Sequence, residues 1–133
     1  MKRAKTTVRE SLRVSFKDGV FASVMSGVTD PYFIPFALVL GATAQQVGWV
    51  SGFPQFFGSL SQLFAVQAVH RIGGRLKMIV GAVLLQAALL SVIALLALVD
   101  LPHRVALFLL LVVSFVVAGA LAGTAWEIGR AHV

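Results

Sequence analysis

The chain has 133 residues, of which 59% are hydrophobic and only 12% are charged, and its formal net charge is +6. Its mean hydropathy of +0.94 excludes a water-soluble core as the explanation of the composition. The chain has no cysteine, which excludes disulfides, thiolate nucleophiles and cysteine-based metal sites. Because the basic residues cluster beside apolar segments, we attribute the positive charge to contact with anionic lipid headgroups and expect no nucleic-acid partner.

Four apolar segments follow one another along the chain, at about residues 20–40, 47–69, 78–99 and 105–125. A helix needs roughly 20 apolar residues to cross about 30 Å of hydrocarbon, so each segment is long enough to span a bilayer. The sequence therefore predicts an all-α membrane protein with one membrane domain, residues 19–126, that contains four transmembrane helices.

The distribution of basic residues predicts the orientation of these helices. The N-terminal tail, residues 1–18, and the turn at residues 70–77 are basic, whereas the turn at residues 41–46 carries no charge and the third turn has only Asp100 and Arg104. Because cytoplasmic loops carry the excess of lysine and arginine, we expect a multi-pass membrane protein with a cytoplasmic N-terminus.

The tail itself carries a helix signal. Thr7 and Glu10 have the spacing of a capping box, and they precede an amphipathic pattern. This pattern favours a short interfacial helix that ends where Gly19 turns the chain into the membrane, although a frayed basic tail fits it nearly as well.

The first span contains an acidic residue, Asp30, followed by Pro31 and Pro35. An aspartate at the centre of a membrane helix costs about 2.5–3.5 kcal/mol, so it needs water, a proton or a partner. Proton coupling or cation recognition would explain Asp30, and so would a structural hydrogen bond to the backbone beside the Pro31 kink. A helix this polar is expected to pack inside a bundle.

A polar stripe marks the second span. Its members recur at steps of four and three residues and therefore share one helical face: Gly48, Gly52, Gln55, Ser59 and Gln62. Small residues allow two helices to approach closely, and glutamines can bond to a partner or to water. The stripe is therefore either a packing seam or the wall of a cavity.

The last two spans are more apolar. Gln86 is the only strongly polar residue inside the third span, which we expect to lie nearer the lipid. In the fourth span, Gly119 and Gly123 have the small-xxx-small spacing that favours close helix packing. Nothing in the sequence indicates an enzyme, a metal site or a cofactor, because the three histidines are scattered and no phosphate-binding loop follows a strand.

Two parts of the sequence resemble a known family. Residues 27–38, 40–43 and 46–48 resemble the first two helices of a bacterial major facilitator superfamily transporter. The basic turn resembles the end of that family's signature between helices two and three, and its matching residues are Arg71, Gly74, Arg75 and Lys77. Arg71 stands where the family has an aspartate, so the salt bridge of that aspartate does not carry over to this chain.

The resemblance implies a secondary active transporter that moves a small solute by alternating access, with about twelve helices in two halves of six. This chain would then supply four helices of the first six-helix half-bundle and would be inactive without the C-terminal helices of the same protein. The resemblance makes four residues candidates for substrate binding and proton coupling: Asp30, Gln55, Ser59 and Gln62.

The C-terminal residues 127–133 resemble the translation of a common short-read sequencing adapter. We therefore expect the natural sequence to depart from this one after Trp126 and the tail to be non-native. Two alternatives remain open. One is a complete four-helix dimeric exporter of the small-multidrug-resistance kind, and the other is a membrane scaffold subunit that transports nothing.

Overall fold

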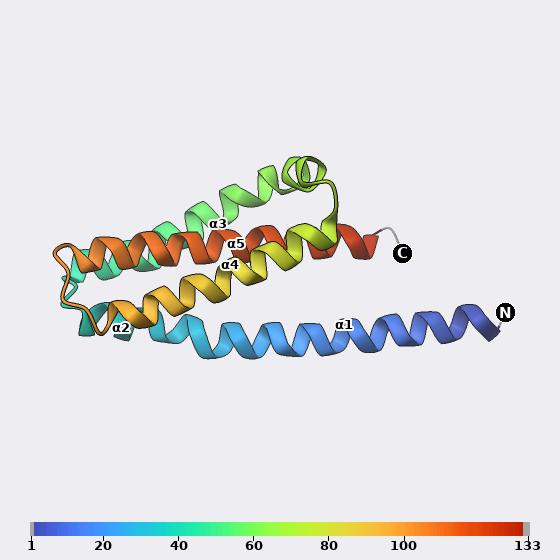
Figure 1. The fold of residues 1–133 in the computed structure, drawn as a ribbon, viewed down its shortest axis with the longest axis horizontal. Helices are drawn as coiled ribbons and strands as arrows, with labels where there is room; N and C mark the ends of the chain where they lie inside the picture. The colour runs from blue at the N-terminus through green and yellow to red at the C-terminus, as the bar shows by residue number, and fades with distance from the viewer. Residues whose placement is uncertain (1, 132–133) are drawn as a thin grey trace. The chain divides into compact units, whose positions relative to one another are not determined.

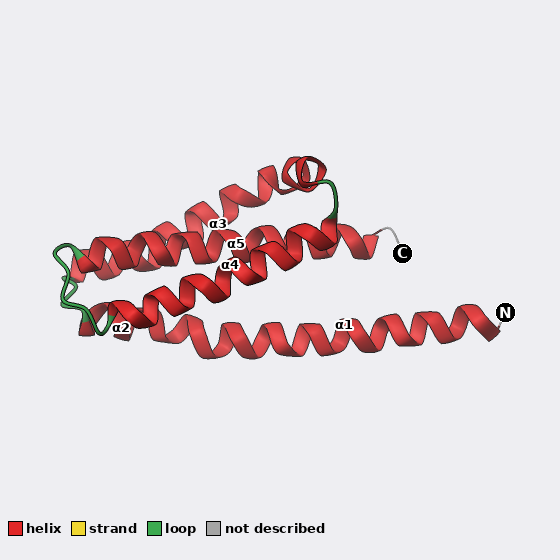
Figure 2. Cartoon of the chain, viewed as in Figure 1, coloured by secondary structure: helices red, strands yellow, loops and turns green. Residues whose placement is uncertain are grey.

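The computed structural model describes residues 2–131, apart from the side chains of residues 2–9, 11, 15, 18, 22, 26, 75 and 129–131. The chain is 88% helical and the described residues contain no strand, which confirms the all-α class (Figure 2). The elements follow one another as α1 (Lys2–Thr29), η1 (Asp30–Tyr32), α2 (Phe33–Val39), α3 (Ala44–Ile72), α4 (Arg75–Leu96) and α5 (Arg104–Ala131) (Figure 1). They form two compact units, and the boundary between the units in the sequence lies between Pro35 and Phe36.

In the first unit, α1 is one continuous helix that passes through Gly19 without a break. The expected turn into the membrane at Gly19 is therefore absent. Thr7 lies inside α1 and not at its start, so it is not the residue that caps this helix. Most of the basic tail and part of the expected non-native tail, residues 127–133, lie outside the described side chains.

The regular α-helix of the first unit ends where the prolines begin. Thr29 is the last residue of α1, and a 3-10 turn with Pro31 in its first positions connects it to α2. Proline has no N–H and its ring clashes with the preceding helical turn, so an α-helix cannot continue unchanged through it. The turn is closed by the N–H of Phe33, which donates to the carbonyl of Asp30. The break in the α-helix that Pro31 and Pro35 predicted is thus present at residues 30–32.

In the second unit, α5 is the central helix. It packs against α3 on one side and against α4 on another, whereas α3 and α4 contact each other little. Helices α3 and α5 run in the same direction and α4 runs opposite to both (Figure 1). The two largest fully buried side chains, Phe108 and Val112, both come from α5. The buried apolar residues of this unit are Ala37, Leu40, Val50, Ala65, Met78, Ile93, Leu96, Phe108, Val112, Phe115, Ala118 and Ala125.

The turns at the ends of α3 are short because local signals end one helix and start the next. Gly41, with φ of 87°, follows α2 in the left-handed region that glycine adopts without strain. Thr43 and Gln46 form a capping box at the start of α3: the Thr43 N–H donates to Gln46 Oε1 at 2.9 Å, and the Gln46 N–H donates to Thr43 Oγ1 at 3.4 Å. At the other end, Gly73, with φ of 76°, ends α3.

Two helices of the described residues are long and apolar enough to cross a membrane, over Leu76–Leu96 and Arg104–Ile128. Only 17% of the first and 28% of the second is buried inside the protein, whereas the core helix of a soluble protein is mostly buried. These exposed apolar helices support a membrane location. The first two of the four predicted spans do not meet the same test. The helix of residues 20–40 is interrupted at Asp30, and α3 contains several glutamines.

Candidate functional site

Asp30 is the first residue of the 3-10 turn between α1 and α2, and its side chain is exposed. Within the described part of the chain, its carboxylate has no hydrogen bond and no ion pair. The structural alternative required the carboxylate to accept a hydrogen bond from the backbone beside Pro31, and the described residues show no such bond. Asp30 is therefore a carboxylate beside a proline-induced break, in the unit that contains α1.

The predicted polar stripe lies along α3 in the second unit, and every one of its members is exposed: Gly48, Gly52, Gln55, Ser59 and Gln62. A Cβ added at Gly48 or Gly52 would meet no atom within 4 Å. The Ser59 hydroxyl donates back to the Gln55 carbonyl at 2.9 Å, which leaves the two glutamine side chains as the free donors and acceptors of the stripe. The stripe is therefore not a packing seam between the helices of this unit.

The packing seam of α3 lies on a different face, which carries Val50, Pro54, Gly58 and Ala65. A Cβ at Gly58 would lie 2.9 Å from Val116 Cγ1 of α5, so only glycine fits the present spacing at this point. The close helix approach that the sequence assigned to Gly48 and Gly52 thus occurs at Gly58. It occurs there because α5 packs against the buried face of α3 and not against the stripe.

Gln86 of α4 is buried, with 7% of the residue exposed, and it faces α5. Its Nε2 donates to the Phe115 carbonyl at 3.2 Å. Gly119 makes room for the amide, because a Cβ there would lie 2.7 Å from Gln86 Nε2. The expectation that the third span lies toward lipid does not extend to this residue, since an amide in an apolar environment is stable only when it finds a partner. The small-xxx-small spacing of Gly119 and Gly123 predicts close packing of this helix, but it does not identify Gln86 as the neighbour.

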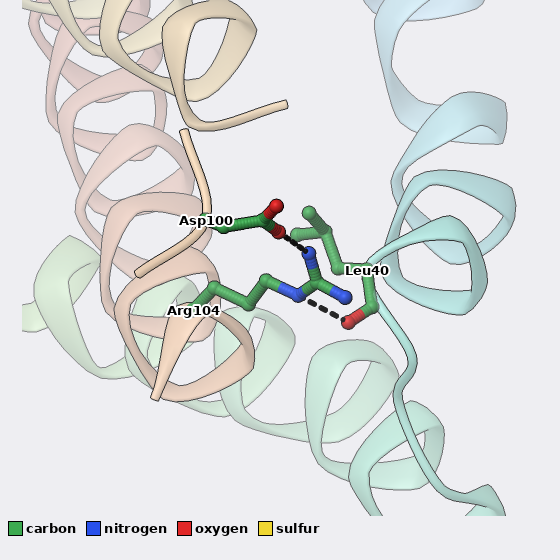
Figure 3. A network of polar contacts seen from close by, with 3 residues as sticks. All are labelled: Leu40, Asp100 and Arg104. Atoms are coloured by element: carbon green, nitrogen blue, oxygen red, sulfur yellow. Dashed lines mark hydrogen bonds and ion pairs between the residues drawn. The ribbon is translucent and has the colours of Figure 1, made fainter. Parts of the chain in front are cut away.

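A polar contact that the sequence did not predict joins the two turns at one end of the second unit (Figure 3). Arg104 Nε donates to the Leu40 carbonyl at 2.8 Å, and Arg104 Nη1 lies 2.6 Å from Asp100 Oδ1. The Arg104 side chain is 37% exposed and the Asp100 side chain is 97% exposed. The turn that follows α2 and the turn before α5 therefore meet at one end of this unit.

The basic turn lies at the other end of this unit, between α3 and α4 (Figure 1). Arg71 is in the last turn of α3 and Lys77 is in the first turn of α4, and both are exposed. Gly74 is the residue before α4, with φ of 159°, and the Arg75 side chain is outside the described part. Among the described residues, neither Arg71 nor Lys77 has an acidic partner.

The candidate residues thus fall into three places: Asp30 in the first unit, the stripe of α3 in the second, and the basic turn at one end of the second. In the part of the chain that the structure describes, no group of three or more His, Cys, Asp or Glu residues could hold a metal ion. No family model, no curated protein and no solved structure matches the chain.

Proposed function

We propose that this chain is part of a secondary active transporter of the major facilitator type, which moves a small solute by alternating access. One observation carries the proposal: the stripe that ends in Gln55, Ser59 and Gln62 is exposed on a helix whose other exposed side chains are largely apolar. A glutamine amide facing hydrocarbon without a partner is costly. In a membrane these amides therefore face water or further protein, as they would in a transport cavity.

The residue types suit such a cavity. Each glutamine amide offers two donors and one acceptor, and Ser59 keeps acceptor capacity after donating to the Gln55 carbonyl. Asp30, a carboxylate with no partner among the described residues, is suited to carry a proton or to bind a cation. The resemblance of residues 27–48 to the first two helices of major facilitator transporters supports the same assignment.

The proposal also accounts for the surface of the second unit. Helices α4 and α5 leave most of their apolar length uncovered. In the proposed protein, lipid and the remaining helices of a six-helix half-bundle would cover it. We propose four membrane spans in all, a cytoplasmic N-terminus and a location in the inner membrane.

Cysteine labelling tests the proposed cavity directly, because the chain has no native cysteine to remove. Single cysteines are placed at Gln55 and Gln62, and at Phe56 as a matched control, which is 62% exposed on the same helix but apolar. With the chain in lipid vesicles, we expect a membrane-impermeant thiol reagent to label positions 55 and 62 faster than position 56. Equal, slow labelling at all three positions would show that water does not reach the stripe and would argue against a cavity.

Transport itself requires the protein that the source gene encodes. A long-read sequence across the Trp126 codon shows whether the reading frame continues into further apolar spans. If it does, the encoded protein is assayed for flux driven by a proton gradient, and Asp30→Asn is expected to abolish coupling while membrane insertion is retained. If the frame stops after Val133, dye efflux by the 133-residue chain alone would instead support the small dimeric exporter.

A further inference from the structure

The α3–α4 turn combines uncompensated positive charge with exposed apolar side chains. Residues 70–77 include Arg71, Arg75 and Lys77 and contain no aspartate or glutamate. Arg71 and Lys77 are exposed, and no acidic side chain pairs with either of them among the described residues. By contrast, the arginine at the opposite end of the unit, Arg104, is neutralised by Asp100. Among the described residues of these two turns, the cations of the α3–α4 turn are therefore unpaired, whereas Arg104 is paired.

Large apolar side chains alternate with these cations. Ile72 is 50% exposed and Leu76 is 75% exposed, so the turn presents hydrocarbon and positive charge together. A nucleic acid or an acidic protein segment would satisfy the charges but would leave these aliphatic side chains in water. A lipid surface satisfies both, because the cations reach the headgroups while the aliphatic side chains enter the acyl boundary.

The position of the turn points to the same partner. The apolar segment of α4 that is long enough to cross a bilayer begins at Leu76, directly after the basic turn. If this helix spans the membrane, the turn lies at the depth of the lipid headgroups.

We propose that the α3–α4 turn is a binding surface for anionic phospholipid, in which Arg71 and Lys77 contact the phosphate groups and Ile72 and Leu76 enter the acyl boundary. Charge complementarity predicts a preference for phosphatidylglycerol over phosphatidylcholine, because the zwitterionic lipid carries no net negative charge. This inference needs α4 to cross the bilayer, but it does not need the protein to transport a solute.

The test places a fluorescent reporter in the turn and asks which lipid surrounds it. Ile72→Trp is made in the 133-residue chain, in which Trp49 and Trp126 are replaced by phenylalanine. The protein is reconstituted into phosphatidylcholine vesicles that contain phosphatidylglycerol as a minor component, with bromine, which quenches tryptophan fluorescence, on the chains of one lipid or of the other. We expect brominated phosphatidylglycerol to quench more strongly than its mole fraction predicts.

Variants of Arg71 and Lys77 decide whether their charge causes the preference for phosphatidylglycerol. Arg71→Gln and Lys77→Gln should each lower the preference for phosphatidylglycerol by up to about fivefold at low salt. Arg71→Lys and Lys77→Arg keep the charge and should keep the preference. Added salt should weaken the preference, since exposed charges are screened.

Three results would overturn the proposal. Quenching that follows mole fraction would show that the turn does not select anionic lipid. Quenching by neither lipid would place the turn away from the membrane. A reporter that responds to an added oligonucleotide but not to phosphatidylglycerol would assign the surface to nucleic acid. Quenching that follows mole fraction does not bear on whether α3 lines a transport cavity, so this proposal can fail while the proposed function stands.

Discussion

Replacing Gly58 by alanine should show whether α3 and α5 meet as closely as the structure has them. The added Cβ would lie 2.9 Å from Val116 Cγ1, which is closer than two methyl groups can pack. Val116 is β-branched and lies within a helix, where its side chain has one strongly preferred rotamer, so it cannot simply turn away. The two helices must therefore move apart, and overpacking of this kind costs about 1–3 kcal/mol.

Gly52→Ala is the matched control, because Gly52 lies on the same helix and a Cβ there meets nothing within 4 Å. Both substitutions gain the same intrinsic helix propensity, up to about 1 kcal/mol, so this gain cancels when the two variants are compared. We therefore expect the Gly58→Ala chain to be less stable than the Gly52→Ala chain by about 1–3 kcal/mol. The expected difference comes from the contact with Val116 alone.

The measurement is the free energy of unfolding in mixed micelles, obtained by titration with a denaturing detergent and followed by circular dichroism. Alanine variants of equal stability would refute the reasoning, because α5 could not then lie against Gly58. A larger loss at Gly52 would mean that the polar stripe is a contact surface, for example between two copies of the chain.

Further substitutions test two contacts of the second unit, those of Arg104 and of Gln86, and the turn at Gly41. Arg104→Gln should lower the free energy of unfolding by about 1–2 kcal/mol, which is in the lower part of the range for charged hydrogen bonds because the side chain is 37% exposed. Asp100→Asn should lower it less, because the Asp100 carboxylate faces solvent. Equal losses of the two variants in detergent unfolding would contradict this order. Gly119→Ala should displace the Gln86 amide and cost roughly 0.6–1.7 kcal/mol. In a double-variant cycle with Gln86→Leu, the two losses should not add, and additive losses would exclude the interhelical bond. Gly41→Ala should cost about 1–2 kcal/mol, because alanine is strained at a φ of 87°, and a stability equal to that of the unmodified chain would show that this turn has another conformation.

The sequence predicted the long helices well because continuous apolar runs leave few alternatives. The predicted spans 47–69, 78–99 and 105–125 lie within or close to α3, α4 and α5. The first span, residues 20–40, was predicted as one kinked helix, and the structure divides it at the 3-10 turn that begins with Asp30. The capping-box spacing predicted a helix start at Thr7, and the same spacing is present at Thr43 and Gln46. At Thr43 it does start a helix, whereas at Thr7 it does not, because α1 already begins at Lys2.

The contacts between helices could not be predicted, because they depend on how each helix is rotated. Gln86 has no polar neighbours on α4 to define a face, and its acceptor lies 29 residues further along the chain. The partner of Arg104, the Leu40 carbonyl, is 64 residues away. Every residue has a backbone carbonyl, so the sequence does not indicate which one accepts this hydrogen bond. The stripe of α3 was correctly placed on one face, but only the structure shows that α5 packs against a different one.

The central position of α5 has a consequence for folding during synthesis on the ribosome. Helices α3 and α4 emerge first and are neighbours in sequence, yet they contact each other little, and both depend on α5 for their packing. At a synthesis rate of roughly 5–20 residues per second, several seconds pass before α5 has left the ribosome. During that interval the α3–α4 hairpin has no folded partner within the second unit. Until α5 is available, the Gln86 amide lacks the Phe115 carbonyl that it contacts in the folded unit, and Gly58 lacks the helix that packs against it.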